Sequence, residues 1–156
     1  MFREPQALND VAAFHNLFDL PILNNPTIPA INRCELRINL LAEELDELKE
    51  AIADNDLVAV ADALCDLQYV LSGAVLEFGL GEKFKALFDE VQSSNMSKAC
   101  DSLEQAEATL SKYAQSGTEG YIVKKEDKFL VYRKSDHKVL KSIGYSEASL
   151  DQFIKS

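Results

Sequence analysis

The sequence predicts a mainly helical fold, an antiparallel bundle of about four to five helices with a small C-terminal β-hairpin. Apolar residues recur at the helical period throughout residues 37–78. Farther on, the runs YIVKK and FLVYRK, separated by Glu126-Asp127, have the composition of two strands joined by a turn. Because 47% of the 156 residues are hydrophobic, the chain can bury a core and disorder is not expected. We expect a helical core at residues 1–116 and a small basic hairpin with a short helix at 117–156.

The stretch from Arg37 to Phe78 organises the rest of the chain. It reads as two helices joined by a tight turn at Asp54-Asn55-Asp56. Each helix carries an apolar stripe that we expect to face the core. The stripes consist of Ile38, Leu41, Leu45, Leu48 and Ile52 in the first helix, and of Leu57, Val60, Leu64, Leu67, Leu71, Val75 and Phe78 in the second. The second helix is apolar nearly all round, which indicates burial on both of its faces.

The region before this stretch predicts a short helix and an extended connector. Asn9 or Asp10 can cap a helix at residues 11–18. The apolar side of this helix is formed by Phe14, Leu17 and Phe18. Pro26 and Pro29 then prevent the helix from continuing. A connector of this length around a helical core can form one wall of a pocket.

Breaks and caps divide the rest of the chain. Phe78-Gly79-Leu80-Gly81 is expected to end the second helix of the central stretch. Ser102 and Gln105 have the spacing of a capping box and predict a further helix after them. Ser146 is expected to cap a last short helix at residues 148–154.

Charge and composition narrow the function classes. A net charge of −10 disfavours binding to nucleic-acid backbones. The N-terminus has no apolar signal region and no run approaches 18 apolar residues, so we expect a soluble, cytoplasmic protein without a membrane role. The three cysteines, an odd number with no CxxC spacing, fit reduced intracellular thiols. His15 is expected to have a packing or hydrogen-bonding role.

Acidic residues on the two central helices indicate a metal site. Residues 38–82 hold eleven acids and one base, Lys49. Glu44 and Glu47 share one flank of the first helix, roughly 75° and 135° from its apolar stripe, while Asp62 and Asp66 share the side opposite the stripe of the second. Carboxylates on such faces are costly unless they are paired or bind a metal. Oxygen-only ligands select magnesium, manganese or calcium over zinc. The alternative is that all four are surface, capping or bridging charges.

The C-terminal region has the opposite charge. Residues 120–141 hold seven Lys or Arg against three acids, a net charge of about +4. This segment either packs electrostatically on the acidic helices or presents lysines, Lys138 and Lys141 especially, to a polyanionic substrate. Both readings stay open at this point.

Several motifs, in order, resemble one family. EELDE at Glu43–Glu47 followed by DALCDLQYV at Asp62–Val70 is similar to the metal-binding pattern of the MazG-like all-α nucleotide pyrophosphohydrolases, a superfamily that includes phosphoribosyl-ATP pyrophosphohydrolases and all-α dUTPases. VAAFHNLFDLP, LRINLLAEELDELKEA, SNMSK and KVLK also resemble members of one branch. The usual pattern is EExxE followed by ExxD, so the chain departs from it at Ala63, where the neighbouring Asp62 supplies the acid.

The resemblance implies roles for particular residues. Glu44, Glu47 and Asp66 would bind the metal directly, with Asp62 as a fourth ligand or as an acceptor behind the ligands, and Glu43 or Glu47 would orient or deprotonate the attacking water. Asn95 and Lys98 would hold the nucleotide, with Lys98 on the phosphates. Arg37 is expected to have a structural role by pairing with the glutamates.

The activity implied is the Mg²⁺-dependent, or Mn²⁺-dependent, cleavage of a nucleoside triphosphate or related nucleotide between the α and β phosphates. Similar proteins are homodimers or homotetramers, and the doubly apolar second helix agrees with one face packing near a partner. A ferritin-like di-metal protein is a rival, but neither His15 nor His137 has the Glu-x-x-His spacing. The other rival interpretation is a non-enzymatic acidic helical module that binds a partner.

Overall fold

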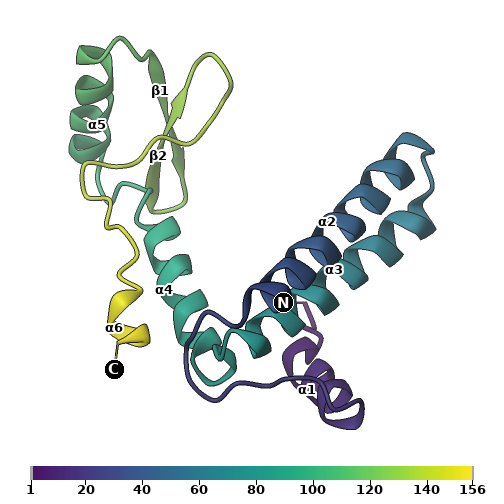
Figure 1. The fold of residues 1–156 in the computed structure, drawn as a ribbon. Helices are drawn as coiled ribbons and strands as arrows, with labels where there is room; N and C mark the ends of the chain where they lie inside the picture. The colour runs from purple at the N-terminus through teal and green to yellow at the C-terminus, as the bar shows by residue number, and fades with distance from the viewer. Residues whose placement is uncertain (1, 156) are drawn as a thin grey trace. The chain divides into compact units, whose positions relative to one another are not determined.

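The computed structural model, which describes residues 2–155, confirms a mainly helical fold with a small two-stranded sheet (Figure 1). The elements are α1 (Ala7–Leu17), α2 (Ile31–Ala53), α3 (Leu57–Glu77), a 3₁₀ turn (Gly81–Lys83), α4 (Phe84–Met96), α5 (Leu103–Gln115), β1 (Gly120–Lys125), β2 (Lys128–Arg133) and α6 (Asp151–Ile154). The chain divides into two compact units, unit 1 up to Phe84 and unit 2 from Lys85. The expected boundary between residues 116 and 117 stays a prediction.

Helices α2 and α3 form an antiparallel pair whose turn was predicted correctly. Asn55 adopts a left-handed conformation (φ 54°), which lets the chain reverse within three residues. Asp56 is the N-cap of α3, and its carboxylate accepts hydrogen bonds from the amides of Val58 (2.9 Å) and Ala59 (3.1 Å). The local sequence therefore fixes both the end of α2 and the start of α3.

The face on which α2 meets α3 differs from the expected apolar stripe. The buried residues of the pair include small ones, Ala51, Ala63 and Gly73, which allow the helices to approach closely. Large residues of the expected stripes are instead exposed: Ile38 (65%), Leu45 (45%) and Ile52 (62%) on α2, and Leu57, Leu64 and Leu71 on α3. The prediction that the stripes face the core of the chain was wrong for these residues. Val75 of the second stripe is buried, and five further stripe residues are half-buried: Leu41, Leu48, Val60, Leu67 and Phe78.

Helix α1 and the connector complete unit 1. α1 begins at Ala7 after Gln6, so neither Asn9 nor Asp10 caps it, and its buried residues are Val11 and His15. The expected apolar side is largely exposed: Phe14, Leu17 and Phe18 are open to solvent by 39%, 76% and 57%. Both predictions were wrong, because α1 packs on α3 through the face that carries His15.

The connector runs along the C-terminal end of α3. Its amides at Leu23 and Thr27 donate to the carbonyls of Leu76 and Phe78 at 3.1 and 3.0 Å. The predicted break after α3 is confirmed: Gly79 has φ +67°, and a Cβ there would lie 1.9 Å from the carbonyl oxygen of Asn25. Residues 22–24 line a cavity of about 170 Å³, so the connector does form a pocket wall.

Unit 2 contains the predicted β-hairpin. β1 and β2 pair antiparallel from Gly120↔Arg133 to Lys125↔Lys128, and Glu126 takes the left-handed conformation in the turn. Its core consists of Cys100, Ala106, Val131 and Leu140. The side chain of Ser102 caps α5 by accepting from the Gln105 amide at 3.1 Å, as predicted.

The last helix is shorter than expected. α6 starts at Asp151 with Leu150 at its N-cap, so Ser146 does not cap it. The backbone of Ser146 is engaged elsewhere: its carbonyl accepts from Ser94 Oγ (2.8 Å) and its amide donates to Ser97 Oγ (3.0 Å). These bonds tie the residues before α6 to the end of α4.

Among residues 2–155, one helix, α3, is long and apolar enough by length and composition to cross a membrane, and core helices of soluble proteins pass the same test. Only 22% of its 18-residue window is buried in the chain. Cys34, Cys65 and Cys100 are all free thiols.

Candidate functional site

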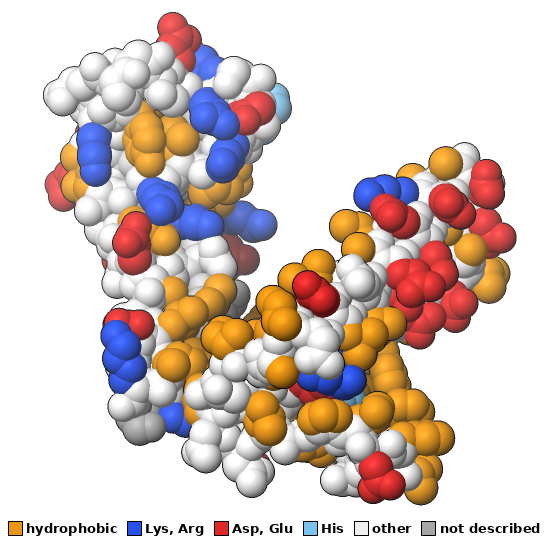
Figure 2. All heavy atoms as spheres, viewed as in Figure 1, with side chains coloured by type: hydrophobic (Ala, Val, Ile, Leu, Met, Phe, Trp, Pro, Cys, Tyr) orange, Lys and Arg blue, Asp and Glu red, His pale blue; other side chains and the backbone are white. Residues whose placement is uncertain are grey.

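The four predicted metal ligands and the candidate base Glu43 lie on the α2–α3 pair. Glu44 on α2 and Asp66 on α3 are half-buried between the helices, whereas Glu43, Glu47 and Asp62 are exposed. Figure 2 shows acidic side chains crowding the half of this pair nearest its turn. Two carboxylates therefore lie in the helix interface and three more lie on its exposed margin.

Glu44 is the electrostatic centre of this group. Partial burial raises the pKa of its carboxyl above the ordinary value, and repulsion from Glu47, Asp66, Glu43 and Asp62 raises it further. Residues on two helices thus act on one carboxyl. The convergence of these acids on one shared ion stays a prediction. The arrangement disfavours the fully ionised state.

No cation in the described residues compensates this repulsion. Lys49, the one base nearby in sequence, pairs with Asp46 at 2.7 Å and is itself exposed. Along residues 2–155, none of the five acids makes a salt bridge or hydrogen bond through its side chain. Within the same residues, no three His, Cys, Asp or Glu side chains stand close enough together to hold a metal ion. All-oxygen donors that repel one another nevertheless fit a hard divalent cation.

Arg37 has a structural role, but with a partner that the sequence analysis did not foresee. Its guanidinium pairs with Glu77 at the far end of α3, and not with the acids of α2. Arg33, one turn earlier, donates to the same carboxylate through Nε at 3.0 Å. Burial by itself raises the pKa of Glu77, but the hydrogen bonds from Arg33 and Arg37 outweigh it, and the net shift is downward.

Glu77 is fully buried, and His15 completes the cluster around it. His15 Nδ1 lies 2.9 Å from the carbonyl oxygen of Pro21, so Nδ1 carries the proton and Nε2 accepts from Arg37 Nη2 at 3.3 Å. Arg37 Nε is buried without a hydrogen-bond partner among the described residues. The sequence held one signal: Glu77 is an acid in the last turn of an apolar helix, where the helix dipole disfavours it unless it is paired.

A cavity of about 210 Å³ lies beside this cluster. Its walls combine aromatic, aliphatic and basic residues: Val11, Phe14, His15, Leu20, Arg33, Leu36, Arg37, Leu40, Tyr69 and Val70. The rings of Phe14 and Tyr69 meet edge to face with centroids 5.8 Å apart. Glu44 follows Leu40 by four residues and Asp66 precedes Val70 by four, so the acids lie about one helical turn from the cavity.

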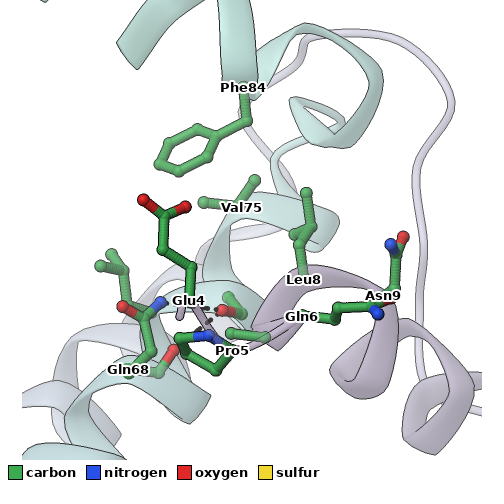
Figure 3. A pocket seen from close by; sticks show the side chains of 11 residues that line it. Glu4, Pro5, Gln6, Leu8, Asn9, Gln68, Val75 and Phe84 are labelled. Carbon is green, nitrogen blue, oxygen red and sulfur yellow. Dashed lines mark hydrogen bonds between the residues drawn. The ribbon is translucent and has the colours of Figure 1, made fainter. Parts of the chain in front are cut away.

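A second cavity in unit 1 has a volume of about 280 Å³ and is a poor candidate for binding phosphate. Figure 3 shows Glu4 and Gln68 beside it, with Val75 and Phe84 along one wall. None of the described residues that line it is a lysine or an arginine. An anionic ligand would therefore find no cationic partner there.

The predicted substrate-binding residues lie in unit 2. Asn95 lies in the last turn of α4, and Lys98 donates to its side-chain oxygen at 2.6 Å. Lys141 lies over the ring of Tyr145 (4.1 Å), and Ser94 donates to the Tyr145 hydroxyl at 3.2 Å, so Lys141 lies near the SNMSK segment. Lys138 pairs with no acid through its ammonium group in the described residues.

The fold and site define a class: a mainly helical protein with a carboxylate-rich pair of helices. The family model for phosphoribosyl-ATP pyrophosphohydrolase matches residues 11–95, which is more than half of the chain. The chain therefore belongs to the phosphoribosyl-ATP pyrophosphohydrolase family, and its general activity is that of a nucleotide pyrophosphohydrolase. Enzymes of this family typically depend on divalent metal ions. A comparison with curated proteins found no match.

The match includes every residue of the acidic group. It ends at Asn95, so Lys98, Lys138 and Lys141 lie beyond it.

The departure from the usual ExxD pattern at Ala63 can be followed in the structure. Ala63 is buried (2% exposed) between the helices, whereas the exposed Asp62 lies about 100° around α3.

Proposed function

We propose that this chain hydrolyses a nucleoside triphosphate, or a related nucleotide, between the α and β phosphates, with Mg²⁺ or Mn²⁺ as cofactor. The observation that carries the proposal is Glu44: partial burial and four other carboxylates from two helices raise its pKa, and no cation among residues 2–155 offsets them. In a family of nucleotide pyrophosphohydrolases, such a group of acids is best explained as a cation site.

The chain supplies ligands and a base. Glu44, Glu47 and Asp66 would bind the cation, with Asp62 either joining them or accepting hydrogen bonds behind them. Their side chains would rotate toward one point, which the exposed Glu47 and Asp62 are free to do. A bound divalent cation neutralises phosphate oxygens and lowers the pKa of a bound water. Glu43 or Glu47 would orient that water and take its proton.

Each of the two units supplies candidate substrate contacts of its own. Asn95 and Lys98 support binding of the nucleotide, with Lys98, Lys138 and Lys141 available to phosphates. The cavity between Phe14 and Tyr69 supports a site for one ring of the base. Its volume of about 210 Å³ is below the range of about 300–1,000 Å³ typical of whole small-molecule sites, so it would admit only a part of the nucleotide.

We also propose that the protein is cytoplasmic and acts as a homodimer or homotetramer, without a nucleic-acid or membrane partner. The net charge of −10 argues against nucleic acid. The low burial of α3 within the chain supports a further protein surface against it.

The decisive experiment is a screen of ordinary, deoxy and modified nucleotides for release of pyrophosphate, with Mg²⁺ and with Mn²⁺. We expect Glu47→Gln and Asp66→Asn to abolish hydrolysis and to remove tight Mn²⁺ binding in calorimetry while the helical circular dichroism is kept. Glu50→Gln on the same helix is the matched control and should keep both. Full activity in Glu47→Gln or Asp66→Asn would exclude that residue from the mechanism.

A second arm tests the phosphate role of Lys98. Lys98→Ala should chiefly raise KM for the nucleotide, and Lys112→Ala, an exposed lysine of α5, serves as its control. Unchanged kinetics in Lys98→Ala would contradict the role. If the protein showed only weak, salt-screened metal binding and no hydrolysis, it would be a non-enzymatic acidic module.

A further inference from the structure

The loop at residues 141–147 lies between β2 and α6 and forms neither helix nor strand, yet α5 holds its backbone (Figure 1). The amide of Ile143 donates to the hydroxyl of Thr109 at 3.0 Å, and Thr109 is fully buried. The amide of Lys141 donates to the hydroxyl of Tyr113 at 3.2 Å. Because a buried hydroxyl without its partner costs free energy, these bonds favour one path of the loop. The backbone at Lys141 is therefore fixed against α5.

The other side of the loop is anchored to the end of α4. Ser94 is buried in the last turn of α4, and its Oγ donates to the carbonyl of Ser146 at 2.8 Å. The same Oγ lies 3.2 Å from the hydroxyl of Tyr145. The amide of Ser146 donates to Ser97 Oγ at 3.0 Å. The loop thus joins α5 to the end of α4, and the Tyr145 side chain reaches across to Ser94.

Tyr145 contacts the Lys141 side chain in two ways. The Lys141 Nζ lies 4.1 Å from the centroid of the Tyr145 ring, within the range of a cation–π interaction. The hydrogen bond with Ser94 lowers the pKa of the Tyr145 hydroxyl, burial opposes this shift, and the Lys141 ammonium lowers the pKa further. The hydroxyl therefore lies close to the ammonium as well. A side chain anchored at α4 holds Lys141 by both its ring and its hydroxyl.

The Lys141 ammonium is still open to an anion. Its side chain is 49% exposed, and its acidic partner in the described chain is Glu147 at 3.8 Å, which is 84% exposed. Such an exposed and long pair contributes little, so a phosphate would displace it. An ammonium has three N–H donors, and the contacts with Tyr145 leave room for a ligand.

The anchor point also brings Lys141 near the second candidate lysine. Asn95 follows Ser94 directly, and its side-chain oxygen accepts from Lys98 Nζ at 2.6 Å. A tyrosine bound at Ser94 therefore holds Lys141 at the end of α4 that carries Asn95 and Lys98. Two ammonium groups gathered at one helix end suit a polyphosphate better than an isolated lysine does.

We propose that Tyr145 is a positioning residue for nucleotide binding: it holds the Lys141 ammonium at the end of α4, where Lys141 and Lys98 meet the phosphates. This rests on the proposed function and deepens its phosphate-binding part. A free lysine loses its rotamer freedom when it binds a phosphate, whereas Lys141 has lost much of this freedom before the phosphate arrives. Removing Tyr145 should therefore weaken nucleotide binding without changing the chemical step.

Two measurements on the full chain test the proposal: steady-state kinetics with a nucleotide that it hydrolyses, and calorimetry with inorganic tripolyphosphate. Tyr145→Phe keeps the ring and loses the hydroxyl, and should raise KM about threefold with kcat unchanged, which corresponds to one hydrogen bond. Tyr145→Leu loses both contacts and should raise KM about tenfold. In a Lys141→Ala background, Tyr145→Leu should raise KM no further, since the side chain that Tyr145 positions is absent.

Tyr121→Phe is the matched control. The Tyr121 hydroxyl is also hydrogen-bonded within unit 2, at 2.9 Å from His137 Nδ1, but this partner is not a candidate phosphate ligand. We expect its KM and its affinity for tripolyphosphate to equal those of the wild type. Circular dichroism checks that each variant is folded. Tyr145→Phe, which keeps the packing of the ring, decides the outcome if Tyr145→Leu does not fold.

An unchanged KM in both Tyr145 variants would overturn the proposal. So would a loss from Tyr145→Leu that is as large without Lys141 as with it. Failure of the proposed function is a separate result, in which no nucleotide releases pyrophosphate. Calorimetry still decides the positioning role in that case, because binding of tripolyphosphate needs no hydrolysis. The role is refuted if the wild type binds no tripolyphosphate, or if Tyr145→Leu binds it as tightly as the wild type does.

Discussion

The two ends of the α2–α3 pair shift the pKa of a buried or half-buried carboxyl in opposite directions. At the open end, Glu77 is fully buried, and hydrogen bonds from Arg33 and Arg37 hold its pKa below the ordinary value. Near the turn, Glu44 is half-buried among other acids, and its pKa is raised. The same two helices therefore contain one charge that the chain has neutralised and one that it has not.

This contrast separates a structural charge from a functional one. A buried ion that is paired and hydrogen-bonded belongs to the fold, because removing its partner leaves an isolated charge in a low-dielectric region. A group of acids without partners lowers the stability of the chain alone. We propose that a ligand supplies the missing positive charge. The comparison predicts that removing the carboxylate charge lowers the stability of the fold at the Glu77 end and raises it at the Glu44 end.

The largest effect is expected at the paired end. Glu77→Gln leaves the charges of Arg33 and Arg37 without a carboxylate and should destabilise the fold by about 3–5 kcal/mol. Urea unfolding followed by circular dichroism measures the change. The lowered pKa means that the contribution of Glu77 is fully present above its unfolded value of about 4.3 and is lost as the pH falls through the folded value. The difference between wild type and variant should therefore shrink below about pH 4.

Glu50→Gln provides the control for this substitution. Glu50 is exposed on α2 and has no ion pair in the described chain, so its replacement should change stability by less than about 0.5 kcal/mol. Equal effects of the two substitutions would mean that the Glu77 cluster contributes nothing specific to the fold.

A smaller effect is expected from crowding the same cluster. A Cβ at Gly73 would lie 2.5 Å from Arg37 Nη1 and 3.2 Å from His15 Nε2. In an open helix Gly→Ala stabilises by about 1 kcal/mol. Here Arg37 is tied to Glu77 and cannot move without breaking that pair, so Gly73→Ala should destabilise by about 1–3 kcal/mol. Thermal unfolding decides the sign, and a raised Tm would show that the guanidinium is free to shift.

Local signals in the sequence predicted the boundaries of the paired helices well. Asn55 and Asp56 define the turn through a left-handed residue and an N-cap, and Gly79 marks the end of α3. The β-hairpin followed from its strand composition and the polar pair at its turn. Each of these features depends on residues that are adjacent in the chain, so each can be predicted from the local sequence.

The choice of buried face and the partner of Arg37 could not be read from the sequence in the same way. Periodicity locates an apolar stripe, but it does not say whether the chain or a second copy covers it, and Ile38 and Leu45 are open in the single chain. Arg37 and Glu77 are 40 residues apart, so no local rule connects them. The acids of the candidate site could be proposed because the family pattern lies in consecutive helices.

The smallest effect, with the opposite sign, is expected at the unpaired end. A raised pKa means that Glu44 favours folding only in its protonated form, and that this contribution is lost as the pH rises through the folded value. Glu44→Gln should therefore slightly raise the Tm of the metal-free protein at pH 7 and leave it unchanged near pH 4. Added Mn²⁺ should then raise the Tm of the wild type more than that of the variant, because only the wild type has a full set of ligands. If Glu44→Gln lowered the metal-free Tm at pH 7, Glu44 would be a structural charge like Glu77, and the contrast between the two ends would fail.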